Sequence, residues 1–237
     1  MNSRKEHLER LKEVQPVTKW NYSYLLWEYQ LKVVISALKK YASGKLLDIG
    51  CGNKPFENYI LPLVDEYVGC DVIQSSLNKV DIICDACSIP LESEYFNTVI
   101  STQVMEHISN FNVFLGETYR LLSKKGVLIL SVPFVWPVHE EPYDFYRFTE
   151  YGLRSNLDKA GFKSAKIIQA GGLWISLGLM FLSFGCKNIQ NPNKLFSIFL
   201  KVYNKLFVFI SNIVFAFLNC KFPCSKIPSS YLVIAFK

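Results

Sequence analysis

The sequence predicts an α/β protein in which a largely parallel β-sheet carries helices on both faces. Short apolar runs recur along the chain with helical stretches between them, and the run 127–133 is almost unbroken in apolar character, as in a strand buried on both faces. A third observation is the turn 48–52, where an apolar strand ends in Asp-Ile-Gly-Cys-Gly. Glycine allows positive φ and close approach of a ligand, so this turn predicts a nucleotide-type site at the carboxyl edge of the sheet.

The elements follow from apolar periodicity and from the residues that break it. Helices are expected at 22–41, 56–63, 111–122 and 149–160, and Lys124, Lys125 and Gly126 are expected to close the third of them. The first helix begins among aromatic residues and is expected to pack on the sheet or to cover the ligand as a lid. Strands are expected at 46–50, 67–72, 82–86, 96–101, 127–133, 163–169 and 231–236.

The residues around the glycine turn indicate the kind of ligand. A dinucleotide-binding turn has a third glycine, but Pro55 stands at that position here. An acid, Asp48, precedes Gly50 by two residues and is a poor neighbour for a phosphate. It suits a cationic ligand, and S-adenosylmethionine carries an ammonium and a sulfonium but no phosphate.

Two further acids end the next predicted strands. Asp71 ends the second strand, nineteen residues beyond Gly52, where a carboxylate can accept both hydroxyls of a ribose. Asp85 ends the third strand and is placed to meet the amino group of an adenine. The acids in order therefore predict an adenosyl ligand.

At these residues the chain resembles the class I S-adenosylmethionine-dependent methyltransferases, of the type 11 kind, over about 45–162 and 231–236. The resemblance implies a Rossmann-like seven-stranded sheet whose final strand is antiparallel. It implies that Asp48, Gly50 and Gly52 surround the methionine part of the cofactor, that Asp71 binds ribose and that Asp85 lies by the adenine. The neighbouring residues complete the expected cofactor contacts: Cys51, Val72, Ala86 and Gln103.

The segment 136–149 leaves the carboxyl edge of the sheet and is dense in prolines, aromatic residues and ionisable groups, so it is expected to face the methyl acceptor. His139 is a candidate general base, and His107, which follows the fourth strand, is a second. Each histidine could instead be structural. Asp144, Tyr146 and Arg147 are candidate substrate-binding residues, although Asp144 and Arg147 could pair with each other.

This segment also resembles bacterial methyltransferases associated with surface-glycan synthesis. The resemblance implies O-methylation of a sugar or a lipid-linked glycan. An apolar metabolite, such as a quinone or a lipid, is the alternative acceptor. A non-catalytic protein that keeps the fold and binds a membrane or a partner is the competing class.

Charge divides the chain into two parts, although the net charge is only +6. All 20 acidic residues lie at or before Asp158, and 10 lysines without one acid follow from Lys159 onward. We expect an N-terminal helical cap at 1–44, a cofactor-binding core at 45–172, a hydrophobic and basic helical insertion at 173–222, and the final strand of the core within 223–237.

The insertion 173–222 has two long apolar segments, and the polar residues of the second fall on one narrow helical stripe. Its uncharged runs are short for a bilayer span, so a helix lying at an anionic membrane surface is expected. Covering the sheet or forming a homodimer is the alternative. Lysines separated by large apolar residues make no continuous phosphate-binding track, so no nucleic-acid partner is expected.

Seven cysteines without a compact framework indicate a reducing compartment. Cys84 and Cys87 have the spacing of half a zinc site, but no second pair at zinc-site spacing accompanies them, so no metal is predicted. The charged N-terminus is unlike a secretory signal. A cytoplasmic protein, possibly located at the inner face of the membrane, is therefore expected.

Overall fold

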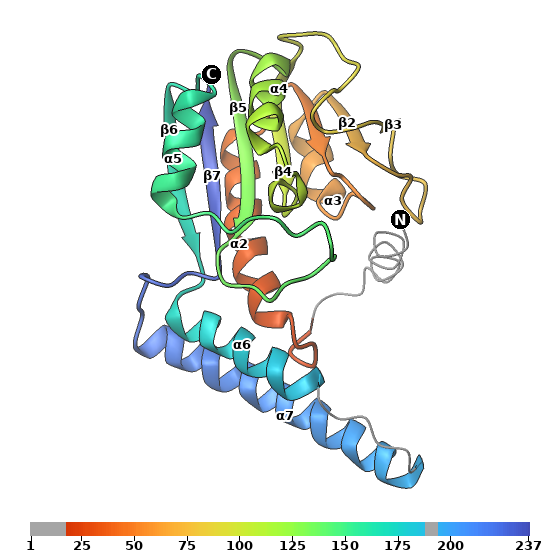
Figure 1. Ribbon diagram of the computed structural model, residues 1–237, viewed down its shortest axis with the longest axis vertical. Coiled ribbons are helices and arrows are strands. Elements are labelled where there is room, and N and C mark those ends of the chain that lie inside the picture. Colours follow the sequence, from red (N-terminus) through yellow and green to blue (C-terminus); the bar gives the residue numbers. More distant parts are fainter. Residues whose placement is uncertain (1–17, 188–193) are drawn as a thin grey trace.

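A computed structural model describes residues 18–187 and 194–237 of the chain; residues 1–17 of the expected N-terminal cap lie outside the described residues. Within these ranges the chain forms a seven-stranded sheet in the order β3-β2-β1-β4-β5-β7-β6 (Figure 1). The final strand runs antiparallel to both of its neighbours, and the other pairings are parallel, as predicted. The strands are β1 Lys45–Ile49, β2 Glu66–Asp71, β3 Ile82–Ile83, β4 Phe96–Thr102, β5 Leu122–Pro133, β6 Ser164–Ala170 and β7 Ser230–Phe236.

Helices cover both faces of the sheet because successive side chains of its buried strands point in opposite directions. On one face, Leu46, Ile100 and Ile129 pack against helix α2 (Tyr24–Tyr41) and against α3 (Glu57–Ile60), which the short 3₁₀ helix η1 (Leu61–Leu63) continues. On the other face, Leu47 and Leu128 pack against α4 (Phe111–Leu121) and α5 (Glu150–Lys159). The two clusters form a three-layer α/β core.

The sequence-based boundaries need correction at two places. Helix α4 ends at Leu121, and β5 begins at Leu122, so Lys124, Lys125 and Gly126 lie inside a strand and do not close the helix. The φ of Lys125 is 69°, in the left-handed region that residues other than glycine rarely adopt, so the backbone of the strand is irregular at this residue. Strand β3 has only two residues, so Asp85 lies in the loop beyond it.

The insertion forms two helices, α6 (Leu173–Lys187) and α7 (Lys194–Lys221), which lie side by side (Figure 1). We call this pair the apolar hairpin. It contacts the core through one small cluster, in which Ile175, Leu179 and Val208 pack on Leu25 and Leu26 at the start of α2. The hairpin joins the end of β6 to the start of β7, and Ser230 of β7 pairs with Pro133 at the end of β5. It therefore lies at the carboxyl edge of the parallel strands.

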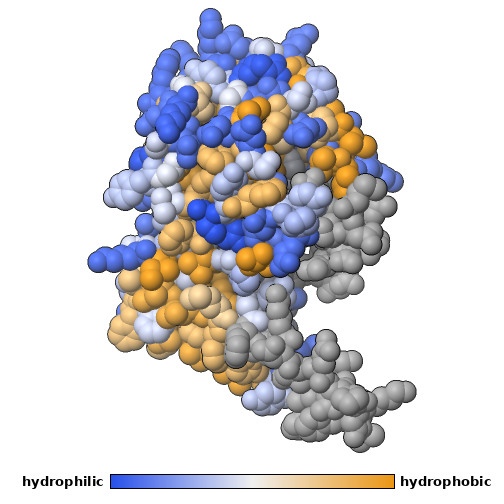
Figure 2. All heavy atoms as spheres, in the orientation of Figure 1, coloured by the Kyte–Doolittle hydropathy of each residue, from blue (hydrophilic) through white to orange (hydrophobic). Residues whose placement is uncertain are grey.

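The polarity of α7 is the reverse of that of an ordinary surface helix. Two of its polar side chains, Ser211 and Asn212, are buried against the protein, whereas Lys205 and Lys221 are exposed. The Nδ2 of Asn212 donates hydrogen bonds to the carbonyl oxygens of Lys19 and Asn21 (2.8 and 2.9 Å). Its apolar side chains face outward, with Leu206 50%, Ile210 51% and Phe217 58% exposed. Figure 2 shows hydrophobic residues gathered over the hairpin and hydrophilic residues over the opposite end of the molecule.

Candidate active site

The glycine turn after β1 has the backbone geometry that its sequence predicts. Gly50 and Gly52 have φ values of 73° and 48°, where side chains other than glycine are strained. A Cβ on Gly50 would lie 2.3 Å from a methyl carbon of Val104, so only glycine lets the segment after β4 approach this closely. The amides of Gly50 and Cys51 both donate to the carbonyl of Cys70 at the end of β2. The turn is thus fixed between two strands.

Asp48 lies beneath this turn and is 3% exposed. The Tyr67 hydroxyl donates a 2.7 Å hydrogen bond to its Oδ2. Burial raises the pKa of Asp48 to about 7, against the opposing effects of this hydrogen bond and of the Lys54 charge. Lys54, almost buried, forms a 2.6 Å ion pair with Asp81. Asp48 therefore lies below the turn as a buried carboxyl group that a cationic ligand would favour in its ionised form.

The predicted ribose and adenine residues lie along the same edge. Asp71 ends β2, where one of its carboxylate oxygens accepts from the amide of Gly52 (3.0 Å) and the other from the amide of Val72 (2.7 Å). Asp85 is exposed, and its side chain accepts from the amide of Cys87. Cys51 is buried in the turn, Val72 is exposed, and Ala86 lies beside Asp85.

These residues fit an adenosyl cofactor with a sulfonium. The turn has glycines at two positions of positive φ, Asp71 ends β2, Asp85 lies just beyond β3, and a third acid, Asp48, is buried below the turn. The third glycine that pyrophosphate binding favours is replaced by Pro55, which is exposed. The donor set is therefore suited to a cationic ligand without phosphates.

The segment after β4 carries Gln103 and His107, which the sequence analysis selected, and Glu106, which it did not. Gln103, with a φ of 56°, donates from Nε2 to the Ser131 hydroxyl (3.3 Å). The short 3₁₀ helix η2 (Met105–His107) follows and carries Glu106, which is fully buried. Burial raises the pKa of Glu106 to about 8, and the Arg147 charge opposes this rise only in part. The sequence feature that could have identified Glu106 is its position next to His107, just after a predicted strand.

His107 and His139 meet although they are far apart in sequence. Their rings are T-shaped with centroids 4.7 Å apart. His107 Nδ1 lies 2.9 Å from the carbonyl of Tyr143; His139 Nδ1 lies 3.2 Å from the carbonyl of Pro137 and 3.1 Å from Oδ2 of Asp144. Burial lowers the pKa of His139, so this imidazole is neutral near pH 7 and can accept a proton.

The polar groups of the three predicted substrate residues bind other parts of the protein. Arg147 makes two hydrogen bonds to the carboxylate of Asp144, of 2.6 and 2.7 Å. The Tyr146 hydroxyl donates to the carbonyl of Ser109 (2.7 Å). Asp144 and Arg147 thus pair with each other, which was one of the two predicted alternatives, and this pair holds the loop that carries His139. Trp136 of the same loop packs against the cluster beneath the apolar hairpin.

Comparison with known proteins agrees with this geometry. Residues 47–130 match the methyltransferase domain family, a stretch that includes the glycine turn, Asp71, Asp85 and the Glu106–His107 pair. The match covers less than half of the chain and indicates a methyltransferase-type domain over this stretch. The row of acids at the carboxyl edge of the sheet is compatible with S-adenosylmethionine as a ligand of such a domain.

Individual relatives are distant. The ubiquinone biosynthesis O-methyltransferase of Bartonella quintana is 23% identical over 107 residues, which cover 40% of this chain and 43% of the relative. The chain thus spans less than half the length of this curated relative.

Solved structures share the fold over most of the chain. An S-adenosylmethionine-dependent methyltransferase from Archaeoglobus fulgidus superposes with a TM-score of 0.56 at 17% identity, covering 92% of this chain and all of the other. A phosphoethanolamine N-methyltransferase from Haemonchus contortus, in complex with S-adenosyl-L-methionine, superposes with a TM-score of 0.54 at 14% identity, covering 93% of this chain and 58% of the other.

Proposed function

We propose that the protein transfers the methyl group of S-adenosylmethionine to a hydroxyl oxygen of an amphipathic acceptor held in a membrane. The observation that carries this proposal is the meeting of His107, His139 and Glu106 beside the glycine turn. Val104, which packs on Gly50, stands two residues before Glu106 in the chain. This proximity supports the assignment of a base next to the end of the cofactor that would carry the methyl group.

The cofactor supplies a methyl group on a good leaving group, so the protein needs to align the acceptor, exclude water and remove one proton. Transfer to the acceptor oxygen would leave the electron pair of the broken sulfur–methyl bond on the sulfur of the bound cofactor. The proton of the acceptor hydroxyl passes to His139, whose lowered pKa keeps it unprotonated at neutral pH. Asp144 and the Pro137 carbonyl, both close to Nδ1, hold the ring in place.

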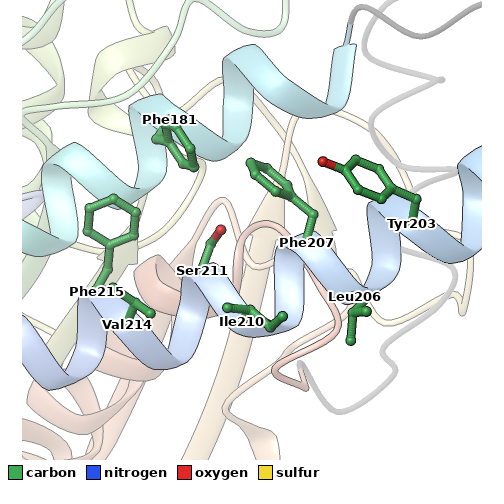
Figure 3. Close-up of a pocket in the computed structure, with 8 residues that line it drawn as sticks. All are labelled: Phe181, Tyr203, Leu206, Phe207, Ile210, Ser211, Val214 and Phe215. Carbon is green, nitrogen blue, oxygen red and sulfur yellow. The ribbon is translucent and has the colours of Figure 1, made fainter.

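The apolar hairpin supports an acceptor with a large apolar part. Between α6 and α7 lies a hollow of about 430 Å³ lined by Phe181, Phe207, Ile210 and Phe215, among others. Figure 3 shows Phe181 of α6 directed toward α7, and its ring lies 5.2 Å from that of Phe207. Trp136 links the cluster below the hairpin to the loop of His139, because its ring is 6.4 Å from the imidazole. Apolar packing therefore connects the hairpin with the loop that carries His139.

Two acceptor classes fit this arrangement, and we favour a quinol or related phenol. The polar groups of Asp144, Tyr146 and Arg147 are occupied within the loop, which leaves few side chains to recognise the many hydroxyls of a sugar. The names of the curated relatives point the same way. A sugar hydroxyl on a lipid-linked glycan is the second candidate, supported by the resemblance of the 136–149 segment to glycan-associated enzymes.

We further propose that the hairpin lies on an anionic membrane surface. Within the described residues, one helical stretch, Val202–Lys221, is long and apolar enough to cross a bilayer, and only 17% of it is buried. Its apolar face is outward while Lys205, Lys221 and Lys226 are exposed near it. Lysines near the surface of an anionic leaflet each contribute about 1 kcal/mol of attraction, so we favour shallow insertion at the cytoplasmic face.

The enzyme proposal is tested with labelled S-adenosylmethionine. Calorimetry should show binding of S-adenosylmethionine and S-adenosylhomocysteine at one site per chain. Incubation with total membrane lipid should then transfer label to an organic-soluble product, and a glycan acceptor would instead place it in material released by mild acid. Absence of cofactor binding at millimolar concentration would contradict the enzyme and favour a protein that only keeps the fold.

A further inference from the structure

The acceptor side of the site contains a cluster of groups that commonly bind metal ions. One ring nitrogen each of His107 and His139 and one carboxylate oxygen of Glu106 lie within 4.8 Å of one another. His107 Nε2 is 3.8 Å from Oε1 of Glu106 and 3.7 Å from Oε1 of Glu140. Ligand atoms around one zinc ion lie roughly 3.3 Å apart, given metal–ligand bonds of about 2.0 Å. Small side-chain movements would therefore close the cluster around a cation.

Both imidazoles are oriented as metal ligands usually are. A carbonyl oxygen can only accept, so the carbonyl of Tyr143 fixes the proton of His107 on Nδ1 and leaves a lone pair on Nε2. The Pro137 carbonyl and the Asp144 carboxylate favour the same tautomer of His139. Metal-binding histidines almost always donate their other ring N–H to a carbonyl or carboxylate in this way. The Arg147 pair in turn fixes Asp144.

The surroundings of Glu106 are an independent sign that this cluster suits a cation. Its side chain is 0% exposed, and neither carboxylate oxygen has a hydrogen-bond partner in the described part of the chain. A buried carboxylate without a partner is costly, whereas a cation beside it would satisfy both oxygens. Two histidines and one glutamate are also a ligand set of catalytic zinc sites, which keep one position open for a reactant.

We propose that Glu106, His107 and His139 bind one divalent transition-metal cation of the zinc type. The inference deepens the proposed function, on which it rests for its role: the open position would hold the oxygen of the acceptor hydroxyl and ease its deprotonation. In that form the two imidazoles are ligands, and the proton of the hydroxyl leaves to solvent. The proposal departs from the sequence-based expectation of no metal, which considered only cysteine spacing.

Metal binding can be measured without cofactor or acceptor. The full chain, stripped with a chelator, is titrated with Zn²⁺ by calorimetry and with Co²⁺ by absorption spectroscopy. We expect one cation per chain and a cobalt spectrum without thiolate charge-transfer bands. Glu106→Gln and His139→Ala should each weaken binding by about 100-fold or more, since even outer-shell substitutions cost 10–100-fold.

Two matched variants control for other ligands. His7→Ala removes a histidine that lies outside the described residues, and Cys87→Ser removes a thiol of the Cys84–Cys87 pair. Both should bind Zn²⁺ as the wild type does. Undiminished binding in the double variant His107→Ala/His139→Ala, or no saturable binding by the wild type, would overturn the proposal.

Cofactor titrations on the same samples separate this proposal from the enzyme itself. Retained S-adenosylmethionine binding in Glu106→Gln shows that the variant is folded, so its loss of Zn²⁺ binding reports on the site. A wild type that binds S-adenosylmethionine but no metal would leave the methyltransferase standing without the cation. A wild type that binds the metal but no S-adenosylmethionine would support the metal site and contradict the proposed methyltransferase.

Discussion

The cofactor edge of the sheet and the apolar hairpin differ in what they expose to water. Around the glycine turn, buried Asp48 accepts from the Tyr67 hydroxyl and Asp71 accepts from the amide of Gly52, while other acids such as Asp85 are exposed. In α7, Asn212 is buried against the core, and the outward surface is apolar. The first region presents polar groups to water. The second exposes a large apolar surface, which is unfavourable in water, so we expect an apolar partner to cover it.

The largest effect should come from the cofactor edge. Asp71→Ala removes the expected acceptor of both ribose hydroxyls and the anchor of the Gly52 amide, so S-adenosylmethionine affinity should fall by about 100-fold or more. Asp65→Ala is the matched control, because Asp65 is an exposed acid just before the other end of β2. Calorimetry checks both variants. Wild-type affinity in Asp71→Ala would mean that the ribose lies elsewhere.

The hairpin should lose its surface when two outward side chains are charged. Leu206→Glu/Ile210→Glu should reduce binding to anionic vesicles by roughly 100-fold, since burying each side chain is worth about 1.5–3 kcal/mol. Leu61→Glu/Leu77→Glu is the control, because these leucines are as exposed but lie outside the hairpin. Co-sedimentation with vesicles measures the effect. If the wild type does not bind vesicles but sediments as a dimer, and the Leu206→Glu/Ile210→Glu variant sediments as a monomer, the surface is a subunit interface.

The inward polar face of α7 gives a smaller effect. Asn212→Ala leaves the carbonyls of Lys19 and Asn21 without their side-chain donor, so the free energy of unfolding should fall by about 1–3 kcal/mol. Asn204→Ala, on the same helix but less buried, should change it little. Urea unfolding monitored by tryptophan fluorescence compares them. Equal stability of both variants would argue against the inward orientation of Asn212.

The smallest effect concerns pH. A cationic cofactor favours ionised Asp48, whose pKa is raised to about 7 by burial in the free protein. Below pH 7 Asp48 is mostly protonated and must lose its proton when the cation binds. The affinity for the cofactor should therefore fall by up to about tenfold between pH 7 and pH 6. Asp48→Asn should lack this part of the pH dependence. Parallel slopes for the two proteins would show that Asp48 does not sense the ligand charge.

Local sequence was informative wherever backbone chemistry decides the structure. Gly50 and Gly52 were predicted to turn sharply because only glycine adopts such φ values readily, and the strands around them follow apolar runs. The predicted start of β5 was wrong because Lys124–Gly126 has the composition of a helix end, whereas the strand already begins at Leu122, which pairs with Phe96 of β4. Tertiary pairing outweighed local preference there.

Contacts between distant residues explain the rest. Glu106 and His139 are separated by more than thirty residues, and only the folded loop, held by the Asp144–Arg147 pair, brings them together. The stripe of polar residues on α7 was visible in the sequence, but a stripe does not say which side faces water. Asn212 settled the direction through partners near the start of the described chain, about 190 positions away.

The two ends of the hairpin meet at one point of the sheet. The amide and hydroxyl of Ser229 both donate to the carbonyl of Ala170, at 3.1 and 2.8 Å, so the residues that enter and leave the insertion are already neighbours. The hairpin is therefore a removable module: a tight turn could replace it without changing the register of β6 and β7. A hairpin from another source could be grafted at the same point, which would join the α/β core to a different outer surface.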